Sequence, residues 1–185
     1  MSRAAWIAGL TIALAAPVHA QNGREHFITP DTALDAAHAS QQQAFLVLRD
    51  STSAISAAGA KLMSGMSPSR SLAWMQTRAR GVVAACSSSS GPLATARAVT
   101  EHAAWPKKPQ QQAQSDLLKE MSSLAGVLTD CEKRWTALAT DTSEVSLRDN
   151  APYQMKVLED KLDKFNRSVR TYLRSIDITL PPSGA

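Results

Sequence analysis

The chain has 185 residues, a formal net charge of +4 and two cysteines. This length suits one domain with a sizeable core. The small surplus of positive charge is spread along the chain, which argues against a nucleic-acid-binding protein. The two cysteines form neither a CxxC redox motif nor a zinc-binding cluster.

The first 20 residues have the three zones of a secretory signal peptide. Arg3 gives a positive start, residues 4–16 form an apolar run, and small residues precede a cleavage site after Ala20. The run is shorter than the ~20 residues of a membrane-spanning helix, and no second run of that length follows. The Ala-rich composition, with Arg favoured over Lys, suggests a bacterium. We therefore expect a cleaved leader, a flexible N-terminus over residues 21–28, and a soluble periplasmic or secreted protein.

A first helix is predicted to begin at Pro30, with Thr29 as its N-cap, and to end at about Lys61 or Ser64. Proline is favoured at the first helical position because its missing N–H would have no partner there. The helix is therefore expected to be long and to start sharply.

A second helix is predicted to start at Ser67 and Pro68, where the same pattern recurs after a tight turn, and to end at Trp105. Pro92 removes a helical hydrogen bond and is expected to kink the helix without ending it. The apolar residues that share one face are Leu72, Met75, Ala79, Val82, Cys86, Leu93, Ala96, Val99 and Ala103.

A third helix is predicted to follow the proline-rich turn at residues 106–109. Its apolar positions alternate steps of three and four, the pattern of a helix that packs along one seam. They are Leu117, Met121, Leu124, Leu128, Cys131, Trp135 and Leu138.

A fourth helix is predicted to open near Ala151 and Pro152, because residues 140–150 are mostly polar. Pro181 and Pro182 are expected to end the fold and to leave residues 181–185 as a loose tail. The apolar stripe of this helix comprises Met155, Leu158, Leu162, Phe165, Val169, Tyr172 and Ile176.

The positions of Cys86 and Cys131 predict a disulfide between the second and third helices. At ~1.5 Å per residue, each cysteine lies about 30 Å from the turn at residues 106–109, so two antiparallel arms would hold them level. An exported protein meets an oxidising compartment, in which such a bond persists. Two buried free thiols are the alternative.

Together these patterns predict an all-α domain over residues 29–180. Four long helices, each with one apolar stripe and short connections, are best buried as an elongated up-down-up-down bundle. The prediction includes a kinked second helix and one disulfide between helices.

The first helix has the least regular stripe, since His38, Gln41, Thr52 and Gly59 occupy inner positions. Four interpretations remain open: a ligand cavity, a loosely held helix, a surface for another protein, or a partly exposed helix with Ala-rich packing. His38 with Met66 or another methionine could imitate the axial ligands of a haem bundle, although no CxxCH motif is present. No cofactor or metal is expected.

Four residues that lie off the apolar stripes of their helices are candidates for binding a partner. Arg167, Arg170 and Arg174 form a basic edge on the last helix, where an anionic partner could dock; cations are also favoured there by the helix dipole. Trp74 lies off the apolar stripe of its helix, so it is a candidate exposed anchor.

The sequence contains no nucleophile elbow, no activated cysteine and no Glu-x-x-His motif, so no catalytic residue is assigned and an enzyme is not expected. The leading hypothesis is an exported, non-enzymatic protein-interaction module, such as an adaptor, chaperone or inhibitor, whose partner is another protein of the cell envelope. The alternative is a periplasmic bundle that binds a small molecule or haem.

Overall fold

The computed structural model describes residues 30–181, with side chains from Leu34 onward. The predicted signal peptide, the segment 21–28, the N-cap at Thr29 and residues 182–185 of the predicted tail lie outside this range. Four helices fill the described part of the chain: α1 (Pro30–Ser64), α2 (Leu72–His102), α3 (Lys108–Thr140) and α4 (Glu144–Ser175). No strand is present among these residues, and the all-α fold class is confirmed.

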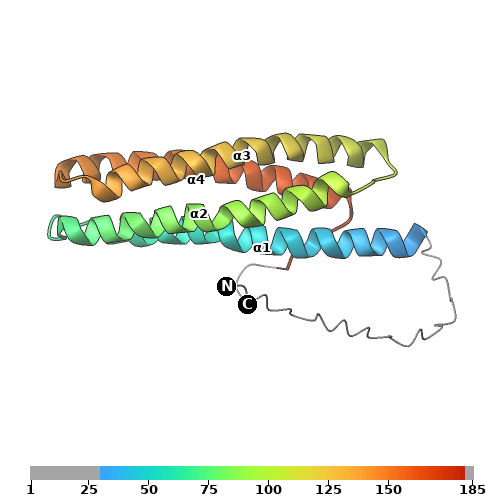
Figure 1. The fold of residues 1–185 in the computed structure, drawn as a ribbon, viewed down its shortest axis with the longest axis horizontal. Coiled ribbons are helices and arrows are strands. Elements are labelled where there is room, and N and C mark those ends of the chain that lie inside the picture. The colour runs from blue at the N-terminus through green and yellow to red at the C-terminus, as the bar shows by residue number, and fades with distance from the viewer. Residues whose placement is uncertain (1–29, 182–185) are drawn as a thin grey trace, which may run out of the picture.

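The four helices lie side by side along the long axis of the molecule, α1 beside α2 and α3 beside α4 (Figure 1). Consecutive helices make the extensive contacts, whereas α1 and α4 touch only sparsely. Within residues 30–181 no helix is both long enough and apolar enough to cross a membrane. The bundle therefore has one open seam, between its first and last helices.

The predicted start of the second helix was wrong. The helix begins at Leu72, and Ser71 is its N-cap, with a hydroxyl oxygen that accepts a hydrogen bond from the Trp74 backbone N–H at 3.3 Å. Residues 67–70 form a connection, in which the carbonyls of Ser67 (2.6 Å) and Arg70 (3.0 Å) accept hydrogen bonds from Arg148 of α4. Serine is a favoured N-cap residue, so Ser67 and Ser71 are both suitable by sequence. The contact from Arg148 of α4 favours Ser71.

The second helix also ends at His102, three residues before the predicted end at Trp105. It is continuous across Pro92, as the prediction required. The kink at that proline stays a prediction.

The predicted start of the fourth helix was also wrong, because α4 begins at Glu144 and includes Pro152. Ser143 caps it by accepting from the Ser146 backbone N–H at 3.2 Å. Asp141 accepts from both the Ser143 N–H (2.8 Å) and the Ser146 hydroxyl (2.6 Å), which fixes the first turn. Leu147 and Ala151 are buried and extend the apolar stripe by two steps of four toward the N-terminus.

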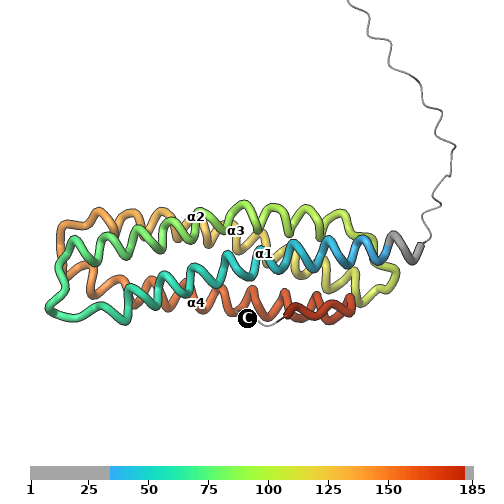
Figure 2. The backbone as a smooth tube through the Cα atoms, turned by 90° about the horizontal axis from the view of Figure 1, so that it is seen from below, coloured from blue at the N-terminus to red at the C-terminus, as the bar shows by residue number. Residues whose placement is uncertain are grey.

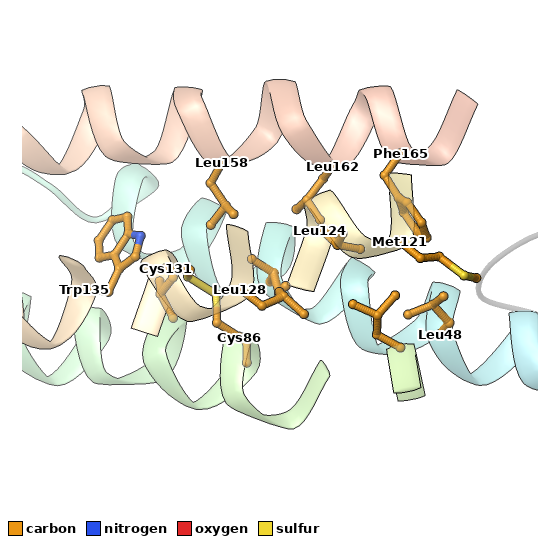
Figure 3. Close-up of a cluster of buried hydrophobic side chains, with 14 of the residues drawn as sticks. Leu48, Cys86, Met121, Leu124, Leu128, Cys131, Trp135, Leu158, Leu162 and Phe165 are labelled. Carbon is orange, nitrogen blue, oxygen red and sulfur yellow. A yellow bond between two sulfur atoms is a disulfide. The ribbon is translucent and has the colours of Figure 1, made fainter. Parts of the chain in front are cut away.

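The predicted stripes form the core. All seven apolar positions predicted in α3 are buried, as are six of the seven in α4, with Val169 half-buried. Figure 3 shows Leu158, Leu162 and Phe165 of α4 pointing toward α3.

The predicted disulfide between Cys86 and Cys131 is confirmed, with Cα atoms 6.3 Å apart (Figure 3). Gln76 of α2 donates to the Asp141 carbonyl at 2.7 Å. Gln76 lies ten residues before Cys86, and Asp141 lies ten residues after Cys131. The helices α2 and α3 therefore stay level with each other from the disulfide to this hydrogen bond, as the equal distances of the two cysteines from the turn at residues 106–109 predict.

Candidate binding groove between α1 and α4

A groove of about 610 Å³ lies along the sparse contact between α1 and α4. Its floor consists of core residues: Phe45 and Leu48 from α1, and Phe165 and Leu173 from α4, each at most 4% exposed. The apolar stripes of both helices supply this floor. The groove therefore lies directly over core side chains of both helices.

The chain after α4 folds back to form a third wall. Asp177 adopts a left-handed conformation (φ 58°), and the Ile178 N–H donates to the Leu173 carbonyl at 2.9 Å, a pattern that stops a helix and reverses the chain. Figure 2 shows the dark-red segment turning back over the end of α4. We call residues 178–181 the C-terminal strap.

The strap is fastened to both helices of the seam. Ile178 and Leu180 are half-buried and pack against the core, while Asp177 and Thr179 are exposed. Arg49 of α1 donates a hydrogen bond to the Pro181 carbonyl. The strap therefore bridges α4 and α1 and closes one side of the groove.

Three arginines line the groove: Arg49 from α1, and Arg170 and Arg174 from α4. The guanidinium of Arg49 is engaged by Asp50 at 2.8 Å and by the strap. Arg170 and Arg174 are exposed and form no ion pair within the described residues. Their charge is therefore free to attract an anionic group to the mouth of the groove.

Beyond the arginines the same seam becomes polar and acidic. A smaller depression of about 270 Å³ is lined by Thr52, Ser53 and Ser56 of α1 and by Glu159, Asp163 and Asn166 of α4. The seam thus has a basic end beside the strap and an acidic end farther along. This polarity gives a charged ligand a preferred orientation.

The structure separates the four residues predicted to bind a partner. Arg170 and Arg174 line the groove, whereas Arg167 is exposed outside it. Trp74 is half-buried near the α1–α2 connection, with the guanidinium carbons of Arg70 and Arg78 5.2 and 5.4 Å from its ring centre. The tryptophan and the arginines therefore do not form one surface.

The sequence interpretation missed Arg49 and the strap. The strap did carry a signal, because Ile176, Ile178 and Leu180 alternate with the polar residues Asp177 and Thr179. A period of two predicts an extended segment with one buried face. Nothing in the local sequence marks Arg49, whose partner in the strap is far away in the chain.

The irregular positions of the first helix are filled by packing. Gln41 donates to the Val99 carbonyl at 3.0 Å, and the Thr52 hydroxyl donates to the Leu48 carbonyl at 3.0 Å. A Cβ at Gly59 would lie 2.2 Å from the Met155 sulfur, so the glycine makes room for that side chain. Gln41 and Gly59 therefore contact neighbouring helices, whereas the Thr52 hydroxyl is satisfied within α1 and lines the groove.

His38 is half-buried and stacks on Trp105, with ring centroids 5.4 Å apart. Met66 lies 28 residues farther along, just beyond the other end of α1 and ~40 Å away, so the two side chains cannot ligate one haem. No His, Met or Cys lines the groove. Over residues 30–181 no three His, Cys, Asp or Glu side chains gather into a potential metal site.

The fold and the groove define an all-α, disulfide-linked helical bundle with one open seam. Comparisons with known protein families, with curated proteins and with solved structures gave no match to this chain.

Proposed function

We propose that this chain is an exported, non-enzymatic binding protein that holds a small molecule in the groove between α1 and α4. The observation that carries the proposal is the groove itself, with an apolar floor, a third wall from the strap and free cations at its mouth. Its volume of about 610 Å³ falls within the ~300–1,000 Å³ typical of small-molecule sites.

The chemistry of the lining supports binding without catalysis. Its polar side chains are arginines, hydroxyls and one amide, and no lining residue is a histidine, cysteine or carboxylic acid that could serve as a general base. Export is supported by the leader pattern of the first 20 residues and by the disulfide, which suits an oxidising compartment.

The neutral fluorescent probe N-phenyl-1-naphthylamine tests this proposal. The purified protein should enhance its fluorescence, and Val169→Trp, which fills the groove from its half-buried wall, should abolish most of the enhancement. Val157→Trp, an equal change on an exposed face of the same helix, is the matched control. Equal fluorescence from the two variants, or no enhancement by the wild-type protein, would contradict the proposal.

A protein-interaction module is the second candidate, and a different surface favours it. A shallow, mainly apolar depression of about 700 Å³ lies over α1 and α2, where Val47 is 46% exposed beside Ala44 and Pro92. Pull-down from periplasmic extract with the wild-type chain and with Val47→Glu tests this role. A protein retained by the wild type and lost by the variant would support it, and retention of nothing would count against it.

A further inference from the structure

We propose that the groove binds a single-chain anionic amphiphile, an alkyl chain with a carboxylate or phosphate headgroup, and that Arg170 and Arg174 hold the headgroup. This inference rests on the proposed small-molecule-binding function. It adds the chemical class of the ligand and its orientation.

The apolar part of the ligand is accommodated by the floor and the strap. Phe45 and Phe165 lie on the floor, and Val169 is half-buried along the wall from α4. Ile178 and Leu180 of the strap line the same space from the other side. An alkyl chain placed here would exchange water for apolar contacts on three sides, which is favourable for every methylene buried.

The headgroup is assigned to Arg170 and Arg174 because they are the cations of the groove that form no ion pair within the described residues. The Arg170 Nε–H donates to the Asn166 carbonyl of its own helix at 3.3 Å, which leaves the two terminal nitrogens of its guanidinium for an anion. They lie four residues apart, so they project from the same face of α4. A guanidinium presents a fork of N–H donors that matches a carboxylate or a phosphate. Arg49 is occupied by Asp50 and the Pro181 carbonyl, which makes it a positioning residue for the strap.

The acidic end of the seam sets the direction of binding. Glu159 and Asp163 line the continuation of the groove and would repel an anionic headgroup placed there. The ligand therefore lies with its headgroup at Arg170 and Arg174.

The strap favours an alkyl chain over a docked helix. An α-helix with its side chains is ~10–12 Å across. The strap spans the seam, fixed by Arg49 at Pro181 and by the buried faces of Ile178 and Leu180. A docked helix would have to displace the strap, whereas an alkyl chain needs only the space that α1, α4 and the strap line together.

Displacement of N-phenyl-1-naphthylamine by four ligands of equal chain length tests the headgroup. The ligands are dodecanoate, dodecyl phosphate, dodecanol and dodecyltrimethylammonium, each below its micelle-forming concentration. Dodecanoate or dodecyl phosphate should displace the probe at a concentration at least about tenfold lower than dodecanol, because two charge-assisted contacts are added. Dodecyltrimethylammonium should be the weakest. The stronger of the two anions identifies a fatty-acid-like or a phospholipid-like source.

The double variant Arg170→Gln plus Arg174→Gln tests the residues. It should weaken dodecanoate binding about tenfold or more and leave dodecanol binding unchanged. The matched control is Lys156→Gln plus Lys161→Gln, which removes the same charge from exposed positions of α4 outside the groove and at least nine residues from Arg170. It should bind dodecanoate within about twofold of the wild-type protein, since distant exposed charges are screened by salt.

The outcomes separate the two proposals. If the probe binds but dodecanoate and dodecanol displace it equally, or if both double variants lose dodecanoate binding equally, the headgroup assignment is overturned and the small-molecule function stands. If an acidic amphipathic peptide displaces the probe at lower concentration than either anion, the ligand class is wrong. If Val169→Trp does not affect the probe, the groove is not the site and both proposals fail.

Discussion

The indole N–H of Trp105 donates a hydrogen bond to the hydroxyl of Tyr172, with 3.0 Å between the heavy atoms and 67 positions between the residues. Both side chains are buried, Trp105 in the α2–α3 connection and Tyr172 in the last helical turns of α4. Phe45 of α1, on the floor of the groove, packs against Tyr172 with ring centroids 5.9 Å apart. The Trp105–Tyr172 hydrogen bond therefore connects the end of the groove beside the strap to the α2–α3 connection.

Replacing Tyr172 with Phe should destabilise the protein by about 1–3 kcal/mol, because the buried Trp105 N–H would lose its acceptor. Urea denaturation measures the change in the free energy of unfolding. The control is Tyr153→Phe on the exposed face of α4, which should change stability by no more than about 0.5 kcal/mol. Equal effects of the two substitutions would show that the hydrogen bond contributes nothing.

The same tyrosine predicts a loss of stability at high pH. Burial raises the pKa of Tyr172 from 10.0 to about 12. Because the folded pKa exceeds the unfolded one, this contribution to stability is complete below about pH 10 and is lost as pH rises through 12. Thermal unfolding of the wild type and of Tyr172→Phe, followed from pH 9 to pH 12, should show their difference narrow. Parallel curves over that range would contradict the prediction.

Loss of the disulfide should destabilise the protein strongly. Cys86 and Cys131 are 45 positions apart, and closing a loop of that length contributes about 4 kcal/mol on the chain-entropy estimate. Denaturation of the wild-type protein with and without reductant measures the effect. The variant Cys86→Ser plus Cys131→Ser should unfold at lower denaturant and be insensitive to reductant. Two free thiols in the non-reduced exported protein would disprove the pairing.

Replacing Gly65 with Ala should displace Trp74. A Cβ at Gly65 would lie 2.2 Å from the indole ring, so the ring would have to move from its place beside Arg70 and Arg78. We expect a loss of about 1–3 kcal/mol, typical of overpacking, and a change in tryptophan fluorescence.

Gly81→Ala is the matched control. A Cβ there meets nothing within 4 Å in the middle of α2, and the substitution should stabilise the protein by about 0.5–1 kcal/mol. If Gly65→Ala remains equally costly in a Trp74→Phe background, the steric explanation is incorrect.

Arg148→Gln should loosen the α1–α2 connection. The guanidinium of Arg148 donates to the carbonyls of Ser67 and Arg70 from the opposite layer of the bundle. Amide hydrogen exchange over residues 67–71 should therefore become faster in the variant. Arg134→Gln is the control, since Arg134 makes only a 3.5 Å contact with Gln154. Unchanged exchange in residues 67–71 would show that Arg148 does not hold the connection.

Local patterns predicted the helices well and their first turns poorly. The apolar spacing in α3 was correct at every position because it depends only on the 3.6-residue period of the helix. The start of α4 was misplaced because residues 140–150 are polar, and Pro152 suggested a first turn. The helix start is set by the hydrogen bonds that Asp141 accepts from Ser143 and Ser146. These residues are close in sequence, but polar side chains are so frequent in residues 140–150 that this cap could not be distinguished from a loop.

The candidate site was only half predictable. Arg170 and Arg174 could be recognised as a basic edge on one helix face, but the groove beside them requires α1 and α4 to meet sparsely. The sequence predicts an exposed Trp74, whereas the structure half-buries it against Gly65 across a connection whose shape no local pattern indicates.

The amino-acid sequence alone determined four helices, the face that each one buries and the pairing of Cys86 with Cys131, because these follow from periodicity and from distance along two arms. Tertiary structure alone decided which seam stays open, where the strap returns and which arginines of the groove form no ion pair within residues 30–181. The physical reason is that these features depend on contacts of α1 with α4 and with the strap, which lie at opposite ends of the chain. Local sequence patterns carry no information about such contacts.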